Sequence, residues 1–195
     1  GVRCTSITEA DVIHYKKNGC CGLRFGIETG SQTMLDIMEK KFTVDDIKKA
    51  VFACYDNGLY SPPLGFMLGM PGESLHTARE SGKLLGEIAA KIGVPPGLIF
   101  GVVDIVYALP LVGTPFYEYG KQIGLIGQGE DEEEKYIELT SKAAYYKRYY
   151  LNFNGAPISE VIFWDMLVFL EATRTFEKLM KNKTLNKEWG KKFIS

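Results

Sequence analysis

The chain has 195 residues, which suits one domain or most of one, and 46% of them are hydrophobic, so it can build a core. A formal net charge of −1 argues against a bare nucleic acid as partner, because its binding requires a strongly basic face. The longest apolar run, residues 161–170, is too short to span a bilayer, and no secretory signal pattern opens the sequence. We therefore expect no nucleic-acid partner, no membrane partner and a cytoplasmic location.

Taken in chain order, short apolar runs alternate with helical patterns. Strands are predicted at residues 2–6, 23–27, 64–68 and 99–109. Helices are predicted at residues 8–18, 32–38 and 43–57 and then from residues 74 and 116, with Thr8, Thr43 and Ser74 as N-caps. Strands that alternate with helices indicate βαβ units, so the fold class is α/β with a parallel sheet of about four strands.

Beyond residue 128 the pattern becomes helical. An acidic stretch, GEDEEEKY, begins this part, and acidic residues near a helix start suit the helix dipole. Residues 136–181 are then predicted to be helical, with a break at residues 152–157. Aromatic residues between Tyr145 and Trp164 either pack as ordinary core side chains or bind a substrate.

Cysteine and histidine give no metal or catalytic pattern. The four cysteines are Cys4, Cys20, Cys21 and Cys54. Their spacings match neither a zinc site nor a disulfide framework, so we expect reduced, structural thiols. His14 and His76 each stand alone, without the partner that a metal site or a catalytic triad needs.

Polar motifs follow three of the predicted strands. Glu28-Thr29-Gly30-Ser31 follows one strand, residues 69–73 follow the next, and residues 110–115 follow the third. Ligands of parallel α/β folds bind at the carboxyl ends of the strands, so we expect these motifs to meet there, with Glu28 beside a ligand. The alternative is structural: Gly-Pro turns are ordinary ways to leave a strand, and Glu28 could cap the following helix.

Three segments carry a resemblance to a known family. They are LRFGIETGSQTMLDIMEKKFTVDDIKKAV, LGFMLGMPGES and ALPLVGTPFYEYGKQIGL. In this order and spacing, residues 2–126 resemble the C-terminal part of a radical S-adenosylmethionine (SAM) domain, of the kind found in cobalamin-dependent radical SAM and Fe–S oxidoreductase proteins. The resemblance implies that residues 1–127 form the later half of a TIM-like (β/α) barrel. Residues 128–195 would form a helical C-terminal extension.

The resemblance also implies a cofactor site. The residues that it places in a SAM site are Glu28, Ser31, Lys40, Gly65, Met67 and Gly69. Glu28 would contact the ribose or the amino group of SAM, with Ser31 nearby, and Lys40 would contact its carboxylate, with Lys41 as a rival. The glycines would let the backbone approach the adenine, and Met67 would pack on the ring or belong to the core.

One departure from the family concerns its chemistry. The family holds a 4Fe–4S cluster with three cysteines spaced C-x-x-x-C-x-x-C, and this spacing is missing here. The resemblance therefore implies a fragment that begins near the third barrel strand and is inactive alone. Its parent would cleave SAM reductively, with the cluster as a further cofactor and with cobalamin in the methyl-transferring members, for radical or methyl-transfer chemistry on an organic substrate. A partial barrel leaves a strand edge open, so we expect either that a second copy pairs there as a homodimer or that the fragment is only marginally stable in solution.

Two other functions stay open. The chain could be a cluster-free, barrel-like binding or scaffolding module. It could also be an ordinary α/β enzyme that uses Glu28 and Glu73 as acid and base. A phosphate loop is excluded, because GMPGES lacks the lysine and hydroxyl pair of that motif.

Overall fold

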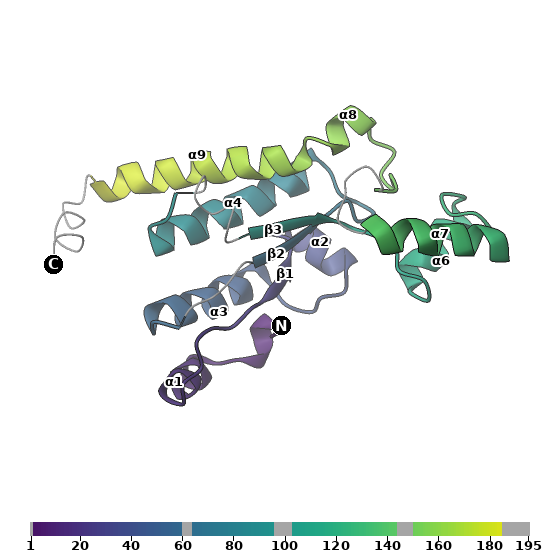
Figure 1. Cartoon of the computed structure of the whole chain (residues 1–195). Helices are drawn as coiled ribbons and strands as arrows, with labels where there is room; N and C mark the ends of the chain where they lie inside the picture. Colours follow the sequence, from purple (N-terminus) through teal and green to yellow (C-terminus); the bar gives the residue numbers. More distant parts are fainter. Residues whose placement is uncertain (1, 60–63, 96–102, 144–149, 185–195) are drawn as a thin grey trace.

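The computed structural model describes residues 2–59, 64–95, 103–143 and 150–184 and has a mixed α/β fold (Figure 1). Its parallel sheet has the order β1 (Gly26–Glu28), β2 (Leu64–Leu68) and β3 (Val103–Tyr107). The helices are η1 (Cys4–Ser6, a 3₁₀ turn), α1 (Glu9–Lys17), α2 (Gln32–Ile37), α3 (Val44–Asp56), α4 (Leu75–Ile92), α6 (Pro115–Gln122), α7 (Glu130–Ala143), α8 (Ile158–Val161) and α9 (Trp164–Thr184). In the ranges that the structure covers, no helix is both long and apolar enough to cross a membrane.

The predicted helix starts are confirmed. Thr8, Thr43 and Ser74 are the N-caps of α1, α3 and α4, and each forms a reciprocal capping box with the residue three positions on. A capping box satisfies backbone donors that the first helical turn leaves free, so these short motifs fix where the helices begin. The acidic stretch also begins a helix, since α7 starts at Glu130.

The strand predictions are confirmed in part. The strand at residues 64–68 is β2, and residues 103–107 of the predicted strand 99–109 form β3, whereas residues 99–102 lie outside the described ranges. The strand predicted at residues 2–6 is wrong. Only Val2 forms a bridge, to Phe25, and the chain then turns through η1 because it must reach the N-cap Thr8 within a few residues. The described residues therefore contain three strands instead of four.

One face of the sheet is covered by helices. Ile27, Phe66 and Leu68 belong to the same buried cluster as side chains of α3 and α4. Parallel strands in consecutive order, joined by right-handed crossovers, place their connecting helices on one face. The hydrophobic core therefore lies between this face and the two helices.

A second layer is formed by α9, which runs along α4 (Figure 1). The two helices approach closely at Gly82 and Gly86 of α4, where added Cβ atoms would lie 2.5 Å from the carbonyl oxygens of Val168 and Ala172. Small residues allow such close packing because no side chain separates the two backbones. The helices α6 and α7 pack on each other in a smaller cluster that projects from the sheet (Figure 1).

The close approach gives the first prediction. Gly86→Ala should lower the free energy of unfolding by about 1–3 kcal/mol, because the new methyl group would overlap the backbone of α9. In an exposed helix the same change would be stabilising by almost 1 kcal/mol. Denaturant unfolding measures the change, with exposed Lys83→Ala in the same helix as the control. A Gly86→Ala protein as stable as the wild type would contradict the observed packing.

Candidate functional site

The second face of the sheet is only partly covered. Side chains alternate along β2, so Phe66 and Leu68 point into the core while Gly65 and Met67 belong to the opposite face, where both are only partly buried. The strand register pairs Gly65 with Asp104, and Asp104 is exposed. We call this second surface the open face.

The open face is hollowed into a recess of about 550 Å³. Its lining includes the charged side chains of Arg24, Glu28 and Asp104. Arg24 Nη2 lies 2.9 Å from Asp104 Oδ2, so an ion pair joins the segment before β1 to β3. Gly65 lies between them on β2 and presents bare backbone. This volume falls within the roughly 300–1,000 Å³ that is typical of small-molecule sites.

Glu28 ends β1 in an unusual backbone conformation. Its φ is 61°, and the Thr29 N–H donates to the Ile27 carbonyl at 2.7 Å, which together form a γ-turn of the rarer, positive-φ type. The register between β1 and β2 also shifts between Gly26 and Glu28, as in a β-bulge. The carboxylate lies back over the strand, because a Cβ on Gly26 would be 3.2 Å from Glu28 Oε1. Both features aim the Glu28 side chain at the open face.

The residues after Glu28 explain how this turn is held. Ser81 of α4 accepts a hydrogen bond from the Gly30 N–H at 2.9 Å, and its hydroxyl lies 3.0 Å from Thr29 Oγ1. Gly30 must be glycine here, since an added Cβ would lie 2.6 Å from the Ser81 Cα. Ser31 is also buried, and its hydroxyl donates to Glu80 Oε2 at 2.5 Å. Thr29, Gly30 and Ser31 therefore dock against α4 on the covered side.

The side chain of Lys40 forms an ion pair with Glu28. Its Nζ lies 2.9 Å from Glu28 Oε1, and the two side chains are 33% and 21% exposed. Glu39 and Lys41 on either side of Lys40 have φ values of 52° and 53°, so the backbone turns sharply after α2. The Lys40 carbonyl also accepts a hydrogen bond from Arg3. The sequence offered Lys40 and Lys41 as candidates for this position, and Lys40 is the one that lies beside Glu28.

The other four residues of the expected SAM site do not all lie at the recess. Gly65 lines the recess and Met67 belongs to the same face, as expected for residues near a ligand there. Ser31 lies on the covered side, away from the recess. Gly69 lies beneath the ring of Tyr150, because a Cβ there would be 2.3 Å from the Tyr150 ring, whose hydroxyl donates to the Gly69 carbonyl at 3.0 Å.

Two polar residues of the recess were not among the predicted site residues. Arg24 and Asp104 interrupt the apolar runs LRFGI and VVDIV. A charged residue inside an otherwise apolar parallel strand was the available signal, because such strands usually have both faces buried.

The turn after β2 ends in a buried carboxyl group, that of Glu73. Glu73 is 4% exposed, and burial raises the pKa of its carboxyl to about 7, against the opposing effect of hydrogen bonds from Thr77 and from the backbone of Gly69 and Ser74. Asn154 covers the turn by accepting from the Gly72 N–H and donating to the Met70 carbonyl. A pKa near 7 suits acid–base chemistry, but this carboxyl faces the interior.

The cysteines do not form a cluster site. Cys4 and Cys54 are buried, and burial raises the pKa of each thiol to about 11, which disfavours the thiolate that binds iron. Cys20 is half-buried and Cys21 is exposed, and both are free. Within the part of the chain described here, no three His, Cys, Asp or Glu side chains gather closely enough to hold a metal ion.

No protein-family model matches the chain, and no curated protein matches it significantly.

The backbone of Glu28 gives the second prediction. Glu28→Gly and Glu28→Ala both remove the carboxylate, so their comparison isolates the backbone. Glycine adopts a φ near 61° without strain, whereas alanine does not, so the glycine variant should be more stable by about 1 kcal/mol. At an ordinary strand position alanine would be the more stable of the two. Urea unfolding of both variants provides the test, and an alanine variant of equal or greater stability would rule out the strained turn.

The third prediction concerns Glu73. Between pH 4.5, the ordinary pKa, and about 7, the folded protein keeps a proton that the unfolded chain releases. Stability from this group should therefore fall as the pH rises through that window, by up to about 3 kcal/mol. Glu73→Gln cannot titrate, so the difference in unfolding free energy between the wild type and this variant should fall from pH 4.5 to 8. A difference that is constant or rises with pH would contradict the raised pKa.

Proposed function

We propose that the open face binds S-adenosylmethionine, as part of a (β/α) barrel of the radical SAM type. The observation that carries the proposal is the recess on the open face, which Glu28 lines and beside which Lys40 pairs with Glu28. Glu28 ends β1, and parallel α/β folds bind ligands at the carboxyl ends of their strands. Consecutive strand order with helices on one face is also the arrangement that a TIM-like barrel needs.

The Glu28–Lys40 ion pair suits the amino-acid end of SAM. An α-amino acid carries an ammonium and a carboxylate on the same carbon atom. Its ammonium would pair with Glu28 and its carboxylate with Lys40, so the ligand would replace one ion pair by two. No charge of the protein would be left without a partner, which avoids the cost of an unpaired, desolvated charge.

The rest of the recess suits a nucleoside. Gly26 and Gly65 present bare backbone on the open face, so a flat ring can approach the sheet closely. Val106 offers apolar contact, while Arg24 and Asp104 offer a donor and an acceptor for ring or ribose atoms. Apolar contacts with a few placed polar groups are typical of small-molecule sites.

In this function the chain binds the ligand and carries out no redox step. SAM, when bound, supplies a methyl group or, with an electron donor, a 5′-deoxyadenosyl radical. The cysteines described above do not fit the three-thiolate site of a 4Fe–4S cluster. This feature favours the second candidate, a cluster-free binding module that uses the same recess. Neither candidate predicts that this chain alone holds a cluster, so the reading frame upstream of it separates the two: a C-x-x-x-C-x-x-C motif there would support the radical SAM type.

The fourth prediction tests ligand binding by isothermal titration with SAM. Glu28→Gln and Lys40→Met should each raise the dissociation constant at least tenfold, about 1.4 kcal/mol, because each removes one of the two proposed pairs. Lys48 and Glu87 form the matched control, a similarly exposed ion pair at 2.7 Å between α3 and α4. Lys48→Met and Glu87→Gln should leave the affinity unchanged.

Two results would refute this function. One is the absence of heat from SAM binding at millimolar concentration of ligand. The other is binding that Glu28→Gln leaves as tight as in the wild type, which would place the ligand elsewhere.

A further inference from the structure

A short loop, residues 150–157, binds the turn that follows β2, and we call this loop the strap. It contains no helix or strand. Asn154 of the strap accepts a hydrogen bond from the Gly72 N–H at 2.7 Å and donates one to the Met70 carbonyl at 3.0 Å. The turn follows the carboxyl end of β2, and ligands of parallel α/β folds bind at this end of the strands. The strap therefore occupies polar groups of the backbone at the ligand-binding edge of the sheet.

The carboxyl group of Glu73 is buried next to the strap. Glu73 is 4% exposed, and within the described ranges its Oε2 atom has no hydrogen-bond partner. The Gly69 N–H donates to this carboxyl, while the ring of Tyr150 in the strap packs on Gly69 and its hydroxyl donates to the Gly69 carbonyl. Gly69 thus connects the buried carboxyl to the strap. A buried carboxylate with an unpaired oxygen is unfavourable, so the closed strap favours the protonated form.

We propose that the strap is a proton-controlled cover, closed over the turn while Glu73 is protonated and opened when Glu73 ionises. Opening lets water reach the carboxylate, which removes the cost of burying a charge. It also uncovers the backbone of Gly69 at the edge of the sheet where ligands bind, so the pH controls access to this edge. This inference does not depend on which ligand binds there.

Linkage gives the size of the effect. Burial raises the pKa of Glu73 from 4.5 to about 7 in the closed state, and water restores the ordinary value in the open state. The closed state therefore holds the proton more tightly, and a rise in pH favours opening. With these two values the equilibrium constant for opening rises about 40-fold from pH 5 to pH 7 and only about twofold from pH 7 to pH 8.

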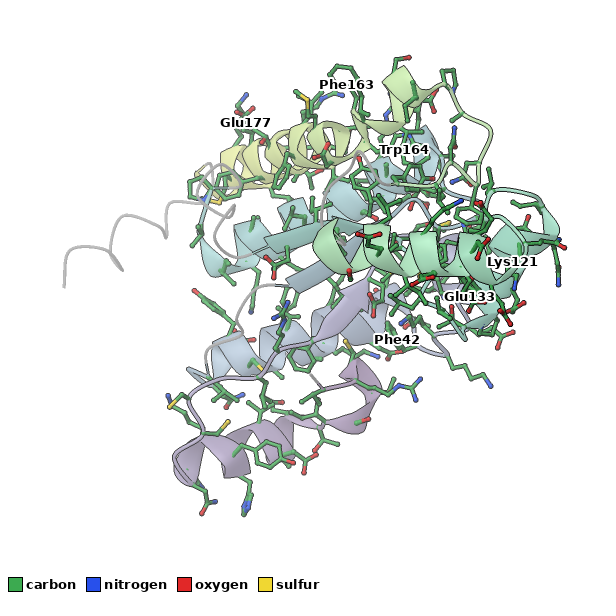
Figure 2. All side chains as sticks on the ribbon, turned by 45° about the vertical axis from the view of Figure 1, so that its right-hand side comes forward. Phe42, Lys121, Glu133, Phe163, Trp164 and Glu177 are labelled. Atoms are coloured by element: carbon green, nitrogen blue, oxygen red, sulfur yellow. The ribbon has the colours of Figure 1, made fainter. Side chains whose placement is uncertain are left out.

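The contacts of the strap allow it to open locally. Tyr150 is its only buried side chain, and the Tyr150 ring contacts Trp164, which points from α9 toward the body of the protein (Figure 2). Phe153 packs on Phe116 and Tyr119 of α6, so the strap can leave the turn and keep these contacts. Segments with few buried apolar contacts open at a lower free energy than the core does.

Other titratable groups near Glu73 do not produce the same effect. The phenols of Tyr107 on β3 and Tyr150 in the strap face it, and burial raises the pKa of both, so neither ionises in this range. Asp165 of α9 lies near Tyr107, and its negative charge would also oppose ionisation of Glu73. On α4, His76 pairs with Glu80 at 3.4 Å on the exposed side. Histidine titrates between pH 5 and 8, so the test needs a variant that changes Glu73 alone.

Amide hydrogen exchange of the full chain between pH 5 and pH 8, corrected for the intrinsic exchange rate, measures the opening. In the wild type the protection factor of the Gly72 N–H, which binds the strap, should fall about 40-fold from pH 5 to pH 7. In Glu73→Gln, which cannot titrate and keeps His76, it should stay constant. The matched control is the Val44 N–H, which also donates to a side-chain amide oxygen, that of Gln32, at 3.2 Å. Its protection should not depend on pH in either protein.

A second variant tests the linkage from the other side. Asn154→Ala removes both hydrogen bonds between this side chain and the turn, so the strap should open more often and the pKa of Glu73, measured from its ¹³C carboxyl signal, should fall. Gln32→Ala removes the matched bond at Val44 and should leave the pKa of Glu73 unchanged.

Three results would overturn the proposal. One is the same pH dependence of Gly72 exchange in the wild type and in Glu73→Gln. Another is a Glu73 pKa that Asn154→Ala leaves unchanged. The third is an equal loss of protection at amides of the α4–α9 interface, since that would show unfolding of the whole domain instead of opening of the strap.

Discussion

The docking of Thr29, Gly30 and Ser31 against α4 determines the geometry of the candidate site. Ser81 binds both Thr29 and the Gly30 N–H, and Gly30 allows the backbone of α4 to approach where a side chain would not fit. These contacts pull the chain to the covered side of the sheet immediately after β1. The reversal falls on Glu28, which adopts a positive φ and directs its carboxylate to the open face. Position and strain at Glu28 thus follow from packing on the opposite side of the sheet.

The ion pair of Glu28 stabilises the fold by less than the strained backbone of this residue destabilises it. A non-glycine residue at a positive φ costs on the order of 1–3 kcal/mol, whereas a partly exposed ion pair such as Glu28–Lys40 contributes about 0–1 kcal/mol. A glycine at this position would adopt the same backbone conformation without the strain. Strained residues that stability does not explain cluster at ligand sites, and the proposed function gives this carboxylate a purpose.

The sequence predicts the parts of this structure that depend on nearby residues. The capping boxes and β2 are local patterns, and the position of Glu28 at a strand end follows from the alternation of strands and helices. The burial of Ser31 depends on Glu80, 49 residues away, and the covering of Gly69 depends on Tyr150, 81 residues away. Such contacts leave no local pattern, so the motif gave no sign of which of its side chains would face a ligand.

The most direct test of the central claim is a titration of the ¹⁵N-labelled chain with SAM, followed by the backbone amide signals. The account predicts shifts concentrated at Gly26, Glu28, Gly65 and Asp104, with signals of the α4–α9 interface unchanged. An unchanged spectrum at millimolar SAM, or shifts confined to the covered side of the sheet, would contradict it.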